Sequence, residues 1–547
     1  MKVTQEYLLE TIHSLNKTNS QDIHGLNMKF VLDHLETLLP VIHHLVNICI
    51  EQSHFPSQWK ISKIIPIFKA DDPTSISNYR PISILPIMSK ILEKIMANQL
   101  LDHLEKNNLL SEHQFGFRSK RSTTTASLFL TEHIRQALNN SHITGAIFID
   151  FRKAFDTVNH QLLLNKLQTF NLHFSAIAML SSYLSDRHQS VFIGKSKSPQ
   201  TACNIGVPQG SILGPLLFIL YINELPTICK STQVIMYADD TVVYVSDQNL
   251  SSINSKLTSD LALLSQWLCA NHLTLNVKKT ECMYFHSIQK KVNLAAHDPV
   301  KLNNVPLTVA TSYKYLGVIL DSQLTYKLHI DKLTKQLKQR LYVFQQIRPY
   351  LTLSLAHLYL NAVVLSKMSY CLPIWGLTAA ETLKPIKQLY NRAHKICTNL
   401  PFRTHQCIAL DKASALSFEK YLKFTSVKLY FLIQNYHTPA LISALLPRHS
   451  ADRRITRSVV NLENQVPKLR ITMDSNPSFT LVLKIGMKSL LTYEDVTPCQ
   501  LLLSKIITKT SSWGGRSAAT NVYSGLHPGP PNGKLILYVS FQPCLSF

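Results

Sequence analysis

Several kinds of segment are missing from this 547-residue sequence. No uninterrupted apolar run approaches the ~18–20 residues that cross a bilayer, and no signal-peptide pattern follows Met1. The ten cysteines are scattered and form no Cys-x2-Cys pair, unlike the dense spacing of a small secreted scaffold. We therefore expect an intracellular protein with reduced thiols and no membrane partner. Because no compact nuclear-import run is present, nucleus and cytoplasm both stay open.

Acidic residues are also scarce. Asp and Glu number 33 against 56 Lys and Arg, which gives a formal net charge of +23. A field of that sign favours a polyanionic partner, either nucleic acid or an anionic membrane surface, and the missing apolar span weakens the second. Hydrophobic residues make up 45% of the chain, so a sizeable core can form and wholesale disorder is excluded.

Cysteine and histidine offer one sparse candidate for a zinc site, formed by His394, Cys397, His405 and Cys407. The spacing fits no common zinc finger, and the first two residues fall on one turn of a predicted helix. We therefore favour incidental core or surface residues over zinc ligands.

Hydrophobic spacing divides the chain into a mixed part and a helical part. Residues 1–50 show the apolar recurrence of helices, and short β-type runs with frequent prolines follow over residues 55–86. A helix is predicted over residues 89–104, and strands are predicted over residues 146–150 and 234–237. The fold class is therefore α/β (α+β), and the mixed region ends near residue 321.

Beyond that point the pattern is helical. Residues 326–350 have apolar residues at helical spacing and carry six Lys or Arg against one Asp. A solvated helix face and a helix along a phosphate backbone are equally good interpretations. We expect the aromatic residues of this segment mostly in the core: Tyr326, Tyr342, Phe344 and Tyr350. Five of the fifteen glycines follow residue 513, and we expect that tail to be disordered or an artefact of the gene model.

The most informative motif is Tyr237-Ala238-Asp239-Asp240. Runs rich in β-branched residues flank it on both sides, which predicts a hairpin with both carboxylates at or beside its tip. Adjacent carboxylates repel each other unless a cation compensates, and Mg²⁺ is bound by one or two carboxylates together with substrate phosphates. Ordinary turn chemistry of Asp-Asp is the alternative.

A second acidic segment favours the metal interpretation. A short apolar strand over residues 146–149 ends in Asp150, where an unpaired buried charge would be costly. Together with Asp239 and Asp240 it could hold two Mg²⁺ ions for in-line phosphoryl transfer. Residues 206–215 contain three glycines, which let backbone approach a ligand closely, although a plain turn before a core helix is the alternative.

Six short segments follow one another along the chain: Asn78–Ser83, Gln114–Arg118, Phe148-Ile149-Asp150-x4-Phe155-Asp156, Gly206-Val207-Pro208-Gln209-Gly210-Ser211, Tyr237-Ala238-Asp239-Asp240 and Tyr313–Gly317. In this order they resemble reverse transcriptases, most closely those of non-LTR retrotransposons (long interspersed elements). The resemblance implies a right-hand polymerase fold with fingers, palm and thumb, followed by a mainly helical C-terminal region.

The same resemblance implies a division into five segments. These are an N-terminal helical extension (1–50), fingers and palm (51–321), a thumb and helical region (322–400), a C-terminal region of uncertain role (401–500) and a disordered tail (501–547). Complete elements of the family usually carry an endonuclease domain ahead of the polymerase, and none is evident in the sequence. We therefore expect a truncated retroelement open reading frame.

The family's site residues map onto this sequence by resemblance alone. Asp150 and Asp239 would ligate two Mg²⁺ ions, for which Mn²⁺ could substitute, with Asp240 as the supporting carboxylate. The other implied residues are Lys69 and Arg80 on the incoming triphosphate, Phe151 and the steric gate Phe155 beside the sugar, Gln209 and Gly210 in the nucleotide and template pocket, and Lys279 as proton donor to pyrophosphate. Taken singly, Lys69 could be a solvated lysine, Phe155 a core residue, and Lys278 a competitor of Lys279.

The implied activity is that of an RNA-directed DNA polymerase, a nucleotidyltransferase that extends a DNA 3′-hydroxyl primer on an RNA template with deoxynucleoside triphosphates. RNA and DNA are then the polyanionic partners. A degenerate retroelement product that binds nucleic acid without turnover is the alternative. An intron-encoded maturase also shares Tyr-Ala-Asp-Asp, but residues 154–160 and the sequence after Asp321 disfavour it. The oligomeric state and the RNA that is copied stay open.

Overall fold

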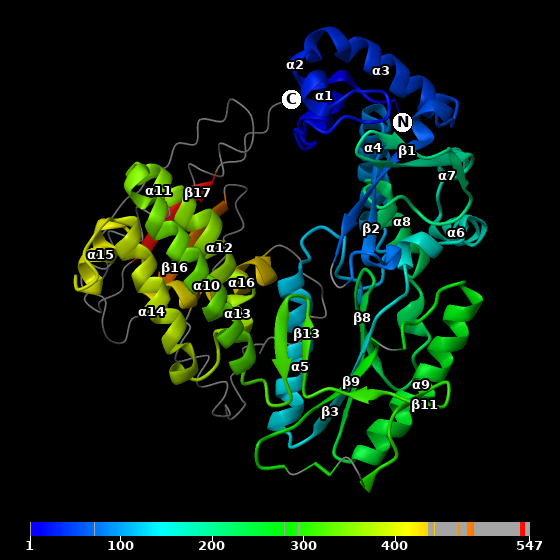
Figure 1. Ribbon diagram of the computed structural model, residues 1–547. Coiled ribbons are helices and arrows are strands. Elements are labelled where there is room, and N and C mark those ends of the chain that lie inside the picture. The colour runs from blue at the N-terminus through cyan, green and yellow to red at the C-terminus, as the bar shows by residue number, and fades with distance from the viewer. Residues whose placement is uncertain are drawn as a thin grey trace. The chain divides into compact units, whose positions relative to one another are not determined.

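The computed structural model describes residues 2–435 apart from residues 70–71, 278, 291 and 294–295, together with residue 442 and three short strands between residues 469 and 541. The chain forms two compact units, of which one ends at Thr325 and the other begins at Tyr326 (Figure 1). This division does not test the limits of the five predicted segments, so those limits stay predictions. None of the described helices is long and apolar enough to cross a membrane.

Three helices begin the first unit, as predicted for residues 1–50: α1 (Gln5–His13), α2 (Met28–Asp33) and α3 (Leu35–Glu51). Thr4 and Asn27 cap the first two by accepting a backbone N–H three residues further on, which satisfies a donor that the first helical turn leaves open. The long α3 buries one stripe of apolar side chains, as an amphipathic helix does.

A first sheet follows, in the region where β-type runs are predicted. β1 (Ile61–Phe68) and β2 (Tyr79–Ile84) form an antiparallel hairpin, and β4 (Arg187–Ile193) lies parallel to β1. The short β5 (Ser196–Lys197) and β6 (Thr201–Cys203) pair with β4. The helix predicted over residues 89–104 is confirmed as α4 (Ile87–Lys106).

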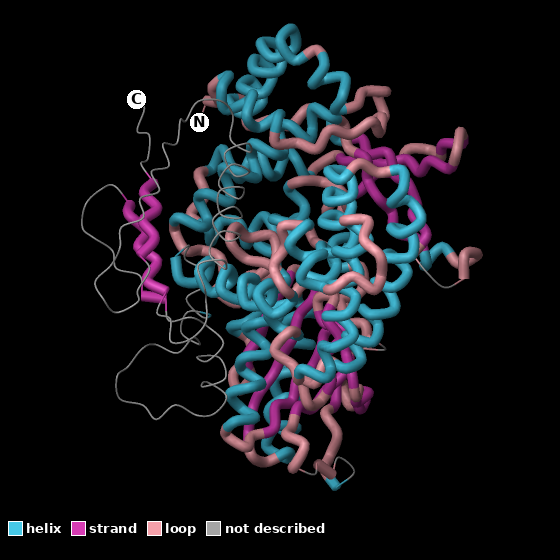
Figure 2. The backbone as a smooth tube through the Cα atoms, turned by 90° about the vertical axis from the view of Figure 1, so that its left-hand side faces the viewer, coloured by secondary structure: helices cyan, strands magenta, loops and turns pink. Residues whose placement is uncertain are grey.

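Five more helices complete the first unit: α5 (Thr123–Asn139), α6 (His160–Leu167), α7 (Phe174–Leu184), α8 (Leu213–Tyr221) and α9 (Leu250–Ala270). Almost every side chain of α8 is buried, which matches its nearly continuous apolar sequence. This unit contains both helices and strands, interspersed along the chain (Figure 2), so the mixed α/β prediction is confirmed.

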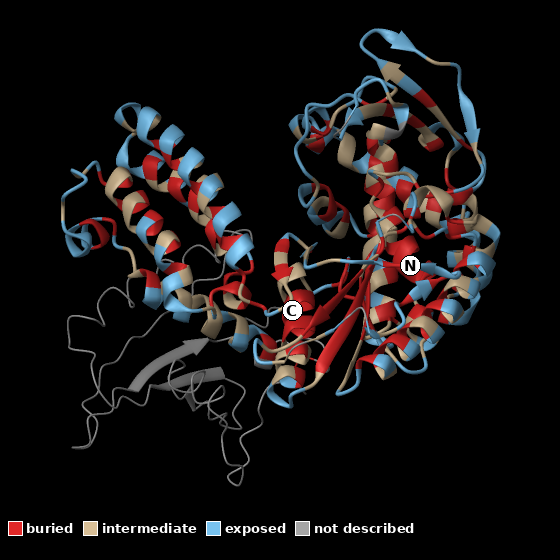
Figure 3. Cartoon of the chain, turned by 60° about the horizontal axis from the view of Figure 1, so that its bottom comes forward, coloured by how far each residue is buried: buried red, intermediate tan, exposed pale blue. Residues whose placement is uncertain are grey.

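The central sheet has the strand order β12-β9-β3-β8-β7. Its strands are β3 (Ile143–Ile149), β7 (Gln233–Tyr237), β8 (Asp240–Asp247), β9 (Glu281–Phe285) and β12 (Thr308–Val309). All seven residues of β3 are buried, because β8 and β9 pair with it on either side and other elements cover both faces (Figure 3). A Cβ at Gly145 would lie 2.5 Å from the Ile253 side chain, so α9 packs closely against one face.

The opposite face of the central sheet receives the hairpin of β13 (Ser312–Tyr315) and β14 (Val318–Asp321). The ring of Tyr313 stacks on Phe148 of β3, with centroids 4.0 Å apart. Two further short strands, β10 (Lys301–Leu302) and β11 (Val305–Pro306), pair with each other.

The second unit is helical from its start, as predicted. It contains α10 (Lys327–Ile347), α11 (Leu353–Tyr359), α12 (Ser366–Ser369), α13 (Leu372–Trp375), α14 (Ala380–Cys397), α15 (Gln406–Lys412) and α16 (Phe418–Asn435), with a π-helical turn over Leu360–Leu365. The three strands β15 (Leu469–Arg470), β16 (Phe479–Ile485) and β17 (Ile536–Phe541) pair antiparallel. The predicted disordered tail otherwise lies outside the described residues, and β17 is a strand that this prediction did not include.

The aromatic residues around α10 correct one expectation. Tyr326 and Phe344 are buried as expected, but Tyr342 is 63% exposed and Tyr350 is 87% exposed. The buried stripe of α10 runs through Leu337, Leu341 and Phe344, and position 342 is turned about 100° away from position 341. Tyr350 lies beyond the end of α10, so helical spacing does not place it on the buried face.

Candidate active site

The predicted hairpin around the two adjacent aspartates is confirmed. β7 and β8 pair antiparallel as far as Tyr237 opposite Asp240, which leaves Ala238 and Asp239 as the two turn residues. Ala238 has a φ of +55°, the left-handed conformation that two-residue hairpin turns require. Both aspartate side chains are exposed at this tip.

Asp150 lies beside this tip because of the strand register. Ile149 at the end of β3 pairs with Thr241 of β8, so the next residue of the one strand meets Asp240 of the other. Loss of surrounding water, then Asp239, then Asp150 raise the pKa of Asp240 to about 6. The pKa of Asp239 is also raised, by loss of water and by Asp150. Three carboxylates from two strands are therefore gathered at one end of the sheet.

A loop after α9 holds Asp150 from its other side. The side-chain amide of Asn276 donates to Oδ2 of Asp150 at 2.9 Å, and the backbone N–H of Asn276 donates to the carbonyl oxygen of Asp150 at 2.8 Å. The backbone N–H of Lys279 donates to the carbonyl oxygen of Asn276 at 3.0 Å, which places the exposed Lys279 on the same turn. The competing Lys278 lies outside the described residues. No pattern in the sequence pointed to this role of Asn276.

Lys69 and Arg80 lie at one end of the β1–β2 hairpin. Arg80 pairs with Ile67, and the backbone N–H of Lys69 donates to the carbonyl oxygen of Asn78 at 2.9 Å, which continues the ladder. Both side chains are exposed and, by this register, lie on the same face. Arg80 is close enough to lower the pKa of Asp239, against the stronger upward effects of lost surrounding water and of Asp150. Two cations therefore stand on the hairpin end that faces the carboxylates.

The glycine-rich segment over residues 206–215 is fixed between two other elements. A Cβ at Gly210, whose φ is +122°, would lie 2.5 Å from the carbonyl oxygen of Ser83 on β2. The side-chain amide of Gln209 donates to Oδ1 of Asp156 at 2.7 Å. The backbone carbonyl oxygen of Gln209 accepts the backbone N–H of Ser83. Close approach to β2 therefore requires a glycine at position 210, and its predicted contact with nucleotide stays a prediction.

The two phenylalanines of the predicted nucleotide site differ in exposure. Phe151 is only 6% exposed and belongs to the main core, so its ring is not presented to a ligand in this structure. Its backbone pairs with Leu275. Phe155 is half-buried, and its ring lies 4.6 Å from that of Phe218 on α8. Phe155 thus contacts the core and keeps part of its ring accessible.

Glu93 of α4 is a buried residue that sequence reasoning missed. Its carboxylate accepts the N–H of Ile212 at 2.8 Å and that of Leu213 at 3.3 Å, at the start of α8. Ser89 donates to its other oxygen. Burial raises the pKa of Glu93, while the neighbouring Arg187 lowers it. This acid therefore anchors the end of the glycine-rich segment, and only its distant partners distinguish it from an ordinary helical glutamate.

The metal predictions have different outcomes. No three His, Cys, Asp or Glu side chains converge as a ready ligand shell within the part of the chain that the structure describes. Of the candidate zinc ligands, His394 and Cys397 are buried, whereas His405 and Cys407 are exposed and contact each other. The three carboxylates fit a divalent cation better, because they repel one another and none forms an ion pair within the described residues.

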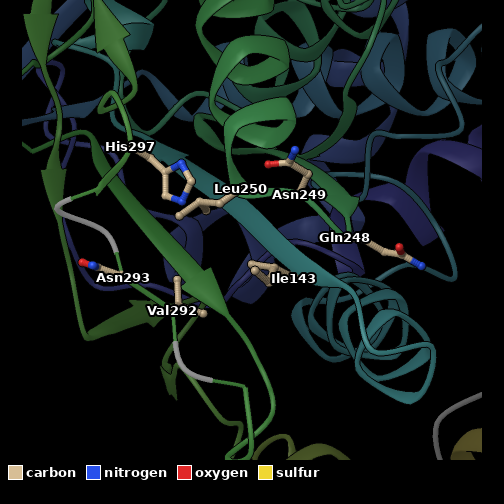
Figure 4. A pocket seen from close by; sticks show the side chains of 7 residues that line it. All are labelled: Ile143, Gln248, Asn249, Leu250, Val292, Asn293 and His297. Atoms are coloured by element: carbon tan, nitrogen blue, oxygen red, sulfur yellow. The ribbon is translucent and has the colours of Figure 1, made fainter.

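A separate pocket of about 300 Å³ lies away from the carboxylates (Figure 4). Ile143, Leu250 and His297 are among its lining residues. Ile143 begins β3 whereas Asp150 follows its end, so this pocket is at the opposite end of the strand and does not belong to the acidic site.

Residues 67–320 match the family model of the reverse transcriptase (RNA-dependent DNA polymerase). This segment is a reverse transcriptase domain. The probable RNA-directed DNA polymerase from transposon BS of Drosophila melanogaster is 33% identical over 65% of this chain and 40% of its own length. The RNA-directed DNA polymerase from mobile element jockey of the same organism is 28% identical over 76% of this chain and 46% of its own length. The chain thus spans less than half the length of these curated relatives.

The predicted family is therefore confirmed for residues 67–320, which form a reverse transcriptase domain similar to the polymerases of non-LTR retrotransposons, and its mixed α/β fold class is confirmed as well. Among solved structures, apo telomerase from Candida tropicalis, truncated from its C-terminal domain, has a TM-score of 0.34 and 14% identity over 48% of this chain and 54% of that chain. Reverse transcriptases in general depend on divalent metal ions.

Proposed function

We propose that this protein is an RNA-directed DNA polymerase that extends a DNA 3′-hydroxyl primer on an RNA template with deoxynucleoside triphosphates. One observation carries the proposal: within a reverse transcriptase domain, Asp150 and Asp240 are adjacent across two strands and Asp239 occupies the turn. Such a cluster costs free energy through mutual repulsion unless a cation compensates it. The location of this cluster at an exposed sheet end suits a site that binds a cation together with its substrate.

Asp150 and Asp239 would be the ligands of two Mg²⁺ ions, with Mn²⁺ as a substitute, and Asp240 would support them. When bound, the ions supply Lewis-acid and charge-stabilising chemistry at the primer hydroxyl and the α-phosphate. Arg80 and Lys69 would bind the triphosphate through charge-assisted hydrogen bonds. The position of Arg80, near enough to affect the pKa of Asp239, supports this role.

We assign the other predicted residues to the sugar, the template and the leaving group of the same reaction. The accessible part of the Phe155 ring would exclude a ribose 2′-hydroxyl, and the segment of Gln209 and Gly210 would contact nucleotide and template. Lys279 would donate a proton to the leaving pyrophosphate, since it follows Asn276 on the turn that binds Asp150. Residues 51–321 would form fingers and palm, and residues 322–400 a thumb whose exposed lysines bind the duplex backbone.

Primer extension on an RNA template, with Mg²⁺ and then Mn²⁺, tests this function. The purified chain is compared with an Asp239→Asn/Asp240→Asn double variant. Extension by the parent and none by the variant is the expected result. Equal extension by both would overturn the site assignment. If a folded parent binds RNA without extending the primer, the polymerase function is wrong and the alternative, a binding protein without turnover, takes its place.

A further inference from the structure

The segment around Gln114 runs along the outer edge of the central sheet, beside β7. The N–H of Phe115 donates to the carbonyl oxygen of Met236 at 2.8 Å, and the N–H of Met236 donates to that of His113 at 2.9 Å. Gln114 and Met236 form a parallel bridge. These contacts fix the backbone of this segment against the last residues before the turn that carries Asp239.

The Gln114 side chain reaches from this segment into the turn. It is fully buried, and its Oε1 accepts the N–H of Ala238 at 3.1 Å and the N–H of Gly116 at 2.8 Å. Its Nε2 has no hydrogen-bond partner among the described residues. The opposite orientation of the amide would place Nε2 against two N–H donors, so the observed orientation is the one that the two donors permit.

Gly116 allows this approach for a steric reason. A Cβ at position 116 would lie 2.6 Å from the backbone nitrogen of Ala238 and 3.0 Å from the carbonyl carbon of Tyr237. No real Cβ atom tolerates such contacts with backbone, so any side chain here must displace the hairpin turn. The positions of Gln114 and Gly116 are therefore matched to one conformation of that turn.

We infer that Gln114 is a positioning residue for the acidic hairpin. By accepting the N–H of Ala238, it holds a non-glycine residue at a φ of +55° and thereby sets the direction in which Asp239 and Asp240 leave the turn. The inference rests on the proposed polymerase function only for its kinetic consequence. The structural part concerns this chain's own residues and can be measured without turnover.

Two isosteric substitutions separate the accepted hydrogen bonds from packing. Gln114→Met keeps the length and volume of the side chain and removes the acceptor. Gln114→Glu keeps an oxygen acceptor in the same place and replaces the unpartnered Nε2 with the hydroxyl of a carboxyl group, which burial keeps protonated and neutral. Gln136→Met is the matched control, because Gln136 is exposed on α5 and its side chain has no hydrogen bond to the acidic site within the described residues.

Hydrogen–deuterium exchange of peptides that cover residues 236–241 is the first readout, in the absence of metal and nucleic acid. Gln114→Met is expected to speed exchange there, while Gln136→Met leaves it unchanged. Single-turnover extension is the second readout: Gln114→Met should lower the incorporation rate roughly 10- to 100-fold, with unchanged primer–template affinity, as loss of an outer hydrogen bond does at metal sites. Gln114→Glu should restore both readouts most of the way.

An exchange rate over residues 236–241 in Gln114→Met equal to that of the parent would overturn the inference. A Gln114→Glu variant as impaired as Gln114→Met would overturn it as well. If Gln114→Met does not fold, Gln114→Asn replaces it, because the shorter side chain keeps an amide and withdraws its oxygen from the N–H of Ala238. Faster exchange over residues 236–241 in that variant supports the inference and parental exchange overturns it. If the parent itself does not extend a primer, the proposed function fails, while the exchange comparison still decides the role of Gln114.

Discussion

At the scale of single residues, Asp150 is held by a partner that leaves its other oxygen open. Asn276 donates its side-chain N–H to Oδ2 and its backbone N–H to the carbonyl oxygen of Asp150. Asn276→Ala removes the first hydrogen bond and keeps the second. Because the carboxylate then turns more freely, we expect a roughly 10- to 100-fold lower incorporation rate with unchanged primer–template affinity. Single-turnover extension and filter binding measure the two quantities.

Asn165→Ala is the control for that prediction. It removes an exposed amide hydrogen bond on α6, donated by Gln161 at 3.1 Å, in which none of the three carboxylates takes part. Its incorporation rate should equal that of the parent. A parental rate in Asn276→Ala would mean that the bond to Asp150 has no functional weight.

Two glycines in left-handed conformations separate backbone strain from steric conflict. At Gly25, with a φ of +80°, a Cβ would meet nothing within 4 Å, whereas at Gly210 it would meet the carbonyl oxygen of Ser83 at 2.5 Å. Gly25→Ala should therefore lower the free energy of unfolding by only about 1–2 kcal/mol. Gly210→Ala should cost more than ~3 kcal/mol and also lower incorporation, since the loop with Gln209 must move. Urea unfolding of both variants tests this, and equal costs would refute the steric explanation.

Buried His394 of α14 makes the second unit sensitive to acid. Neither ring nitrogen has a hydrogen-bond partner among the described residues, and burial, assisted by His357, lowers the pKa of His394 to about 4 from an ordinary 6.5. Between these values the unfolded chain binds a proton that the folded chain does not, so stability falls as pH decreases from 6.5 towards 4. Through His394 the parent should lose up to about 2 kcal/mol of stability between pH 6.5 and 5. The variant His394→Phe should not show this part of the loss.

Urea unfolding at pH 7.5 and 5 measures this difference for parent and variant. His329, whose pKa is also lowered to about 4 by burial, stays in both proteins, so an acid-sensitive remainder is expected. If parent and His394→Phe lose the same stability between the two pH values, the buried imidazole is not responsible.

At the scale of elements, α10 and Arg348, the residue directly after its end, show which cations of this segment are available to a ligand. Arg340 donates to the carbonyl oxygen of Val363, and Arg348 donates to those of Cys397 and Leu351, so both serve the helical packing. Lys335 and Lys338 are exposed, and neither forms an ion pair with another described residue. Lys335→Glu/Lys338→Glu should weaken RNA binding and reduce the slope of log K against log salt by about one per lysine.

Fluorescence anisotropy over a salt series measures that slope. Lys106→Glu on α4 is the control, since Lys106 is exposed but already paired with Asp102 at 2.8 Å. An unchanged slope in the α10 double variant would favour the solvated-face interpretation of this helix.

The elements also show what sequence could predict. The acidic hairpin was predictable because β-branched runs and the turn are local, and α10 because its apolar stripe repeats within one helix. The roles of Gln114 and Glu93 were not, because their partners lie 124 and 119 positions away in the sequence. A buried Gln or Glu in a polar-looking segment has no local pattern that names its partner. Phe151 shows the same limit. The resemblance assigned it to the nucleotide site, whereas the packing that buries its ring cannot be recognised from the motif.

At the scale of the whole molecule, RNA binding through net charge should be separable from primer extension. The net charge of +23 predicts binding of RNA that weakens strongly with salt, through phosphate neutralisation. Asp239→Asn/Asp240→Asn removes two negative charges and takes the net charge from +23 to +25. The double variant should therefore bind RNA at least as tightly as the parent at both 50 and 200 mM salt while it fails to extend a primer. Anisotropy and extension on the same preparation test this, because a variant that loses binding as well would reveal a folding defect and not a missing catalytic pair.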